Sequence, residues 1–477
     1  MVDVHKLLGI ALSHQSKRII MDLAFQQFSE QLNGHLILPK DADYNEARKI
    51  YNAMIDKHPA VIVKCKDASD VVQAVNFARE HNLETSIRSG GHNGAGLALC
   101  DDGLVIDLSD MKAIDIDADK GTARIESGNT LAEVDKATHE YGLALPSGII
   151  GSTGIGGITL GGGLGYLSRK GGLTIDNLLE CEVVLASGEL VTANKDTNAD
   201  LFWALRGGGG NFGVVVSFTF NLIPVKNIYG GPMLWPLEKA SEALRFYDEL
   251  TKNASHDLYG FFAFLIVPPV DPFPEDLHNK NLCGVVWCYT GPMEQAEEVF
   301  RPIREFGPPI LDFVGEMPMP VLNGMFDGLF PSGMQWYWKA HYVSELTDAC
   351  IDVNVKYGSM VPTMRSTMHF YPIDGKVHEV NNEDTAWANR GARWAQVIVG
   401  VDPEPENASK ITKWCKDYYE AMIPHAHGGA YVNFMMEEKE GRVEASYGNN
   451  YERLATIKAQ YDPENFFHIN QNIKPKA

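Results

Sequence analysis

Short apolar runs alternate with helical segments from residue 56 to about residue 225. The helical segment Asp70–Glu80 follows Asp67 and Ser69, either of which can cap its N-terminus. Thr130 and Glu133 have the spacing of a capping box and predict the start of another helix. Apolar runs of strand length predict strands at Val61–Cys65, Thr85–Arg88, Leu104–Leu108 and Thr122–Ile125.

The flanking regions have a different pattern. Residues 1 to about 55 predict helix, because apolar positions recur at helical spacing through Ile19–Phe28. Residues 226 to about 430 contain many prolines and aromatic residues and predict broader strands and helices. Near the C-terminus, Asn450–Gln460 predicts an amphipathic helix. The pattern therefore indicates a mixed chain with a distinct middle region.

Composition narrows the possible partners. The chain has 477 residues, enough for two or three domains, and its 45% hydrophobic and 22% charged residues are ordinary for a globular protein. Its 41 basic and 62 acidic residues give a net charge of −21. Nucleic acids and anionic membrane surfaces attract clustered Lys and Arg, so this balance argues against both as partners.

Cysteine usage predicts neither a disulfide framework nor a zinc site. The seven cysteines are odd in number, and no two have the C-x-x-C spacing. His and acidic residues also lack metal-ligand spacing, so we expect no metal. A reducing, cytoplasmic setting fits best. Met1–Ser13 lacks the cleavage site of a secretory signal, and the broken apolar run Leu258–Val270 is too short to span a bilayer.

Glycines gather in three clusters, at residues 88–94, 148–165 and 207–213. Such clusters occur where the backbone approaches a ligand closely or adopts a positive φ. The second cluster can form an anion-binding nest suited to a pyrophosphate, or a tight packing crossover. The third contains the G-x-G-x-x-G spacing, but the predicted helix Ala199–Leu205 precedes it and the predicted strand Val214–Phe220 follows. A nicotinamide Rossmann site needs a strand before the glycines and a helix after them, so we reject that site. The third cluster is then either a simple helix-to-strand turn or a direct contact with another cofactor.

Several segments together resemble a known family. Arg88-Ser-Gly-Gly-His92-Asn93, the glycine run Gly154–Gly165, Lys170–Asn177 and Leu201–Gly213 are similar to the FAD domain of the vanillyl-alcohol-oxidase superfamily. The C-terminal residues 447–473 resemble the berberine-bridge-enzyme segment. The resemblance implies an α+β protein with a PCMH-type two-subdomain FAD-binding fold, formed by residues 1–225 and 430–477. Residues 226–429 would form an α/β substrate domain with a large antiparallel sheet.

The resemblance also implies how FAD is held. In the family, the histidine of this motif carries the flavin through its 8-methyl group, which points to a covalent bond at His92. Such a bond needs a neutral, nucleophilic imidazole. Several relatives have a second link through a cysteine, whose position is Ile150 here, so we expect one link only. Thr153 occupies a position thought to gate oxygen, which leaves oxidase and dehydrogenase open but favours oxidase.

Further cofactor contacts follow from the same motifs. We expect them at Arg88, Ser89, Gly90, Gly91, His92, Asn93, Gly148, Ser152, Thr153, Gly154, Gly157, Gly162, Gly165, Val214, Val215, Asn433, Phe434, Asn470 and Asn472.

The catalytic base is harder to place. Many relatives have a Tyr base in a Tyr-x-Asn-Tyr strand, but this chain has Phe434 at that position, and phenylalanine cannot accept a proton. Alternation in predicted strands puts Tyr337 and Lys339 on one face, and His369 and Tyr371 on one face of another strand. These four residues are the candidates, and Lys339 could lower the pKa of a neighbouring tyrosine. The alternative is that the aromatic residues form sheet core and that Lys339 reaches water.

The expected activity is that of an FAD-dependent oxidase. Hydride would pass from an alcohol or amine carbon of a small ring compound to flavin N5 and then to O2, giving H2O2. The partners would be the small-molecule substrate and O2. The alternatives are a flavin dehydrogenase with another electron acceptor and a flavin-binding protein without turnover.

Overall fold

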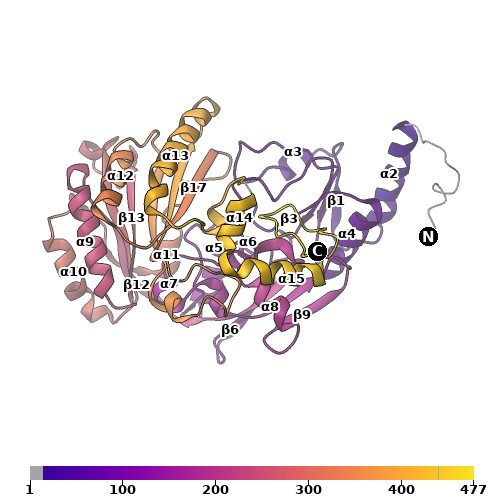
Figure 1. Cartoon of the computed structure of the whole chain (residues 1–477), viewed down its shortest axis with the longest axis horizontal. Helices are drawn as coiled ribbons and strands as arrows, with labels where there is room; N and C mark the ends of the chain where they lie inside the picture. Colours follow the sequence, from indigo (N-terminus) through magenta and orange to yellow (C-terminus); the bar gives the residue numbers. More distant parts are fainter. Residues whose placement is uncertain (1–13, 439) are drawn as a thin grey trace.

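The computed structural model describes residues 14–438 and 440–477. The N-terminal half and the C-terminal helices α14 (Glu440–Tyr447) and α15 (Tyr451–Tyr461) lie together on one side of an elongated molecule, and the middle of the chain forms the other side (Figure 1). The arrangement agrees with the fold expected from the resemblance. Residues 1–13 of the predicted N-terminal region lie outside the described part.

A four-stranded sheet begins the first half, in the order β1 (His35–Ile37), β2 (Val61–Lys64), β4 (Leu104–Asp107) and β3 (Thr85–Arg88). Helix α4 (Ala68–His81) packs on it, and the Asp67 side chain accepts hydrogen bonds from the first turn, as the sequence predicted. Helix α2 (His14–Ser29) packs against α4 through Phe28, whose ring stacks on that of Phe77 with 4.2 Å between the ring centroids. Strand β1 and the short helix α3 (Tyr44–Ala47) were not predicted, because three residues at a sheet edge carry too little periodicity.

A five-stranded antiparallel sheet completes this half. Its order is β5 (Ile114–Asp117), β6 (Thr122–Glu126), β10 (Val214–Asn221), β8 (Leu178–Val184) and β9 (Leu190–Asn194). The predicted capping box of Thr130 and Glu133 begins α5 (Leu131–His139). Helix α8 (Ala199–Leu205) precedes β10, which confirms the element order that excluded a Rossmann site. Shorter elements connect these parts: β7 (Leu143–Ala144), α6 (Ile155–Leu160), α7 (Ser168–Gly171) and β11 (Ile223–Pro224).

The middle of the chain forms an eight-stranded antiparallel sheet. Its central order is β15 (Leu311–Asp312), β12 (Asn227–Pro236), β14 (Asn281–Tyr289), β13 (Leu258–Ile266), β18 (Thr367–Pro372), β19 (Trp394–Asp402) and β17 (Gln335–Val343), with β16 (Gly315–Pro318) also paired to β12. Four helices cover one face: α9 (Ala240–Asn253), α10 (Ala296–Glu305), α12 (Asp348–Gly358) and α13 (Ala408–Met422) (Figure 1). The other face, beside α11 (Met319–Asn323), turns toward the first half.

The described residues contain no membrane-spanning helix, no metal-binding cluster and no disulfide. No helix within 14–438 and 440–477 has the length and apolar character needed to cross a membrane. The same part of the chain contains no group of His, Cys, Asp and Glu side chains arranged to hold a metal ion. All seven cysteines fall within it, and each is buried and unpaired with another cysteine.

Candidate active site

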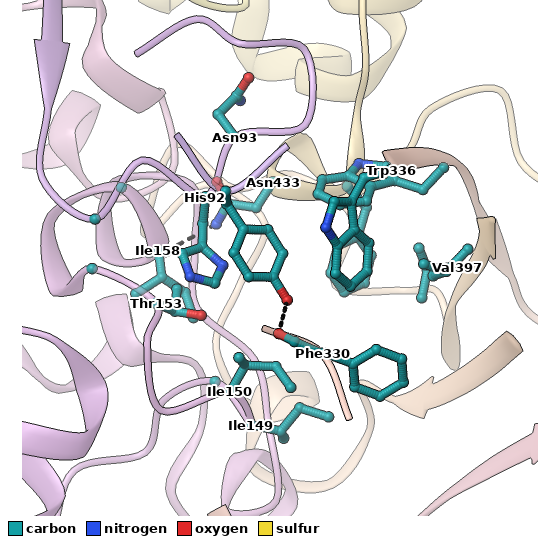
Figure 2. Close-up of a pocket in the computed structure, with 18 of the residues that line it drawn as sticks. His92, Asn93, Ile149, Ile150, Thr153, Ile158, Phe330, Trp336, Val397 and Asn433 are labelled. Atoms are coloured by element: carbon teal, nitrogen blue, oxygen red, sulfur yellow. Dashed lines mark hydrogen bonds between the residues drawn. The ribbon is translucent and has the colours of Figure 1, made fainter. Parts of the chain in front are cut away.

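A cavity of about 770 Å³ lies between the two halves of the molecule. The glycine-rich turns of the first half form one wall, and the uncovered face of the eight-stranded sheet forms the other. Figure 2 shows His92, Thr153 and Ile150 on one side, with Trp336 and Val397 on the opposite side. The cavity therefore joins the predicted cofactor residues to the middle region of the chain.

Two glycine turns pack backbone to backbone at the cofactor wall. A Cβ atom on Gly90 would lie 2.2 Å from the backbone nitrogen of Gly154, so only glycine permits this approach. The hydroxyl of Ser89 donates to the carbonyl of Ser127 at 2.6 Å and accepts from the Gly156 amide at 3.3 Å. These bonds tie the turn after β3 to the turn before α6.

Other glycines leave space open for a ligand. A Cβ atom on Gly157 or Gly210 would meet no atom within 4 Å, and both residues line the cavity. By contrast, Gly162 packs on Trp387, and Gly165 approaches the carbonyl oxygen of Ser147. Part of the second glycine cluster therefore faces the cavity, as a ligand-binding nest would, and the rest is tightly packed, as a packing crossover would be.

His92 presents a neutral imidazole to the cavity. Its ring stacks on Tyr51 with 3.8 Å between centroids, and its Nε2 atom lies 2.9 Å from the Ser152 hydroxyl. Burial lowers the pKa of His92 to about 4, so the ring is uncharged at neutral pH. Tyr51 is held in turn by donating a hydrogen bond to the carbonyl of Phe330 at 2.7 Å. Sequence analysis missed Tyr51, which lies outside every recognisable motif.

Most of the predicted cofactor residues gather around this cavity. The members that line it are Ser89, Gly90, Gly91, His92, Asn93, Gly148, Thr153, Gly154, Gly157, Val214, Val215, Asn433, Phe434 and Asn470. Arg88 instead points behind the turn, where it pairs with buried Asp107 and supports the end of β3. Asn472 is not among the lining residues.

The segment around Ile150 lies at the cavity, and the single flavin link stays a prediction. Ile150 lines the cavity, and none of the seven cysteines does. Asn433 donates to the carbonyl of Ile158 at 3.0 Å, which holds the C-terminal segment against α6. Asn470 donates to the carbonyl of Gly210, while its own Oδ1 atom is buried without a partner. This acceptor is available to a donor group of a bound ligand.

The candidate catalytic residues separate into two groups. His369 and Tyr371 on β18 both line the cavity, with 2.6 Å between His369 Nδ1 and the Tyr371 hydroxyl. Burial lowers the pKa of His369 to about 3 and raises that of Tyr371. The ring of Phe261 packs against both residues.

Tyr337 and Lys339 lie on the opposite, helix-covered face of the sheet. Alternation along β17 turns their neighbours Trp336 and Trp338 into the cavity instead. Lys339 does not reach water but forms an ion pair with Glu438 at 2.5 Å. Burial, with the nearby Cys415 and Glu438, raises the pKa of Tyr337 to about 12. The lowering that Lys339 was expected to cause is therefore not found.

Family patterns match two separate segments of the chain. The pattern described as "FAD binding domain" matches residues 59–194, and that described as "Berberine and berberine like" matches residues 430–474. An FAD-linked oxidoreductase from Dictyostelium discoideum is 32% identical to this chain, over 94% of the chain and 96% of the relative. The chain belongs to the berberine-bridge-enzyme-like family of FAD-linked oxidoreductases.

Two further comparisons concern members of this family with named activities. The (R)-6-hydroxynicotine oxidase of Paenarthrobacter nicotinovorans is 28% identical over 94% of this chain and 98% of that protein. The crystal structure of 6-hydroxy-D-nicotine oxidase from Arthrobacter nicotinovorans superposes with a TM-score of 0.84 at 25% identity, covering 93% of this chain and 98% of that one. The fold class inferred from sequence is thereby confirmed.

The residues of this berberine-bridge-enzyme-like chain fit FAD. The cavity has a glycine wall with open space at Gly157 and Gly210 and an unpartnered buried acceptor on Asn470. It also presents a neutral imidazole on His92. A large planar cofactor with a pyrophosphate can use backbone amides, apolar walls and few charges, which is the character of this lining.

Proposed function

We propose that this FAD-linked oxidoreductase is an oxidase with FAD bound covalently to His92, acting on an alcohol or amine carbon of a small ring compound. Bound FAD would accept a hydride from that carbon and pass the two electrons to O2, giving H2O2. The observation that carries the proposal is the shared cavity, with His92 on one wall and the His369–Tyr371 pair on the other. Similarity to a 6-hydroxynicotine oxidase, in sequence and in crystal structure, supports an oxidase.

The environment of His92 supports covalent attachment. Bond formation at the flavin methyl group needs a nitrogen lone pair, which burial provides by keeping the imidazole unprotonated. The stack on Tyr51 and the contact with Ser152 restrict the ring to one orientation. The cavity presents no thiol for a second link, since Ile150 occupies the family's cysteine position and every cysteine lies elsewhere.

The His369–Tyr371 pair supports a proton acceptor that replaces the family tyrosine. When His369 Nδ1 is unprotonated, the Tyr371 hydroxyl donates a hydrogen bond to this nitrogen. The Tyr371 oxygen can then take the proton of a substrate hydroxyl or amine as its own proton moves to His369. Phe434 offers no such group, and its ring lies only 5.7 Å from that of Tyr371. The two positions thus share one region of the cavity.

The aromatic wall supports a ring-shaped substrate. The side chains of five aromatic residues line the cavity: Phe261, Phe326, Phe330, Trp336 and Trp338. Aromatic faces and edges bind planar molecules through stacking and edge-to-face contacts. The wall accommodates an aromatic ring, an alkaloid-like amine or a sugar ring.

The covalent bond is tested by His92→Ala. The purified wild type should retain yellow colour in the acid-precipitated chain, whereas His92→Ala should release its flavin to the supernatant. The matched control is His256→Ala, because His256 is a partly exposed histidine outside the cavity. Flavin that still precipitates with the His92→Ala chain would disprove the attachment.

The reaction is tested by a peroxide-coupled screen of alcohols, amines and phenols, followed by anaerobic reduction with any hit. Substrate-dependent H2O2 supports the oxidase. The protein would be a dehydrogenase if a substrate reduced the flavin and a quinone, but not O2, reoxidised it. Thr153, which lines the cavity, is compatible with either activity. Flavin that no compound bleaches would indicate binding without turnover.

A further inference from the structure

Arg365 is the single Asp, Glu, Lys or Arg side chain among the described residues that line the cavity. The two histidines of the lining, His92 and His369, are neutral because burial lowers the pKa of each. The remaining lining is apolar, aromatic, glycine or uncharged polar. The charge that a substrate meets in this cavity is therefore positive and comes from one guanidinium.

The guanidinium has no carboxylate partner within the described chain. Arg365 is half-buried, and its recorded bond is a donation to the backbone carbonyl of Leu329. Interior arginines elsewhere in the protein pair with acidic side chains, as Arg88 does with Asp107 and Arg390 with Asp176. A guanidinium has five N–H donors, so Arg365 keeps donors for a further acceptor.

The turn that holds Arg365 is well anchored. Thr363 and Ser366 flank it, their hydroxyls lie 2.6 Å apart, and Thr363 donates to the carbonyl of Val401 at 2.6 Å. The bond to Leu329 connects the arginine to the loop that also presents Phe330 to the cavity. The position of the positive charge is thus set by the surrounding structure.

The backbone of Arg365 is separated from that of Tyr371 along the direction of β18. It precedes β18, which begins at Thr367, and Tyr371 follows four residues later, a rise of roughly 13 Å along the strand. Apolar residues of the segment 265–273 line the cavity as well. A ring substrate can therefore place its reacting carbon near the His369–Tyr371 pair while an acidic group at its other end meets Arg365.

We propose that Arg365 binds a carboxylate of the substrate, so that the preferred substrates are ring compounds with an acidic group remote from the oxidised carbon. The inference rests on the proposed function, because it assigns the substrate to the same cavity. The pairing is favourable because a charge-assisted hydrogen bond in a mostly apolar, partly enclosed site is stronger than one in water.

Binding of unreactive probes tests this inference without turnover. The probes are benzoate, 2-naphthoate and biphenyl-4-carboxylate, each compared with its neutral carboxamide by calorimetric titration of the flavin-loaded protein. We expect at least one acid to bind about tenfold more tightly than its amide, as for a hydrogen bond to a charged group. This preference should disappear in Arg365→Gln and persist in part in Arg365→Lys. Arg301→Gln is the matched control, because Arg301 is an exposed arginine outside the cavity.

Three outcomes would overturn the inference. One is that no acid binds more tightly than its amide in the wild type. Another is a preference that survives Arg365→Gln. The third is a loss of acid and amide binding in equal measure, which would make Arg365 a support for the Leu329 loop alone. Failure of the proposed function is separate, because it is detected by the peroxide screen and not by these titrations.

Discussion

The hydroxyls of Tyr371 and Tyr337 have different surroundings, although both residues belong to the same sheet. Tyr371 faces the cavity and contacts His369 Nδ1, whereas Tyr337 is covered by helices on the far face. Burial raises the pKa of both hydroxyls, so neither exists as a phenolate at neutral pH. Only Tyr371 has a neighbouring base that can take its proton as it accepts one from a substrate.

Tyr371→Phe should therefore slow flavin reduction by any substrate found in the screen. We expect a decrease of roughly 100-fold or more, the usual contribution of a positioned proton acceptor. Rapid-mixing absorbance under anaerobic conditions measures the step directly. Tyr337→Phe, the matched control, should leave it unchanged, and an unaltered rate in Tyr371→Phe would remove the His369–Tyr371 pair from the mechanism.

At the scale of elements, the glycine turns have two separable roles. Gly90 permits the turn after β3 to meet the turn before α6, because a side chain there would collide with Gly154. Gly157, inside α6, faces open cavity and makes no such contact. Close packing therefore explains the first glycine, whereas the second leaves cavity space that the proposed cofactor can occupy.

Alanine at each position should separate these roles. Gly90→Ala should destabilise the flavin-free chain by about 3 kcal/mol, the upper range for overpacking. Gly157→Ala should keep the melting temperature of the flavin-free chain, since alanine favours helix, but reduce the flavin bound after reconstitution. Thermal unfolding and the ratio of flavin to protein absorbance give the two readouts. Equal melting temperatures for Gly90→Ala and the wild type would contradict the packing argument.

At the scale of the whole molecule, buried polar contacts join the two halves that enclose the cavity. Arg390 of the middle region forms a two-bond ion pair with Asp176 of the first half, at 2.6 and 3.0 Å. Asn323, at the end of α11, donates to the carboxylate of Asp135 on α5 at 2.7 Å. Asp327 accepts from the Gly151 amide of the turn that presents Ile150 and Thr153.

Asp135 makes this interface sensitive to pH. Burial, with the nearby charge of Asp327, raises the pKa of Asp135 to about 7. An acid with a raised pKa in the folded protein contributes stability that is complete below its unfolded pKa, near 3.8, and is lost as the pH rises through about 7. The folded protein is therefore less stable at pH 8 than at pH 5, because the ionised carboxyl of Asp135 is buried.

Asp135→Asn should abolish this dependence. We expect the substitution to stabilise the protein by about 2–3 kcal/mol more at pH 8 than at pH 5, because it removes a charge that is buried only when Asp135 is ionised. Urea unfolding at both pH values measures the difference. Asp115→Asn, at an exposed aspartate, is the control. The same change in stability at pH 5 and pH 8 would show that Asp135 does not titrate in this range.

Features that depend on neighbours in the chain could be predicted from the residues alone. The capping box of Thr130 and Glu133, the order of helix and strand around Gly208–Gly213, and the two faces of β17 and β18 all agree with the structure. Each arises from bond geometry and side-chain direction over a few residues. The glycine motif at His92 and its resemblance to a known family predicted a set of cofactor residues, most of which line one cavity in the structure.

Features that depend on distant segments needed the folded chain. Alternation shows that Trp336 and Tyr337 face opposite sides of a strand, but only the packing of α13 on one side shows which of them meets the cavity. Tyr51 contacts His92, and Arg365 contacts Leu329, across separations that leave no periodic signal in the sequence. Burial and contacts between distant segments determine which polar groups are charged, paired or open to a substrate, and local patterns do not encode these properties.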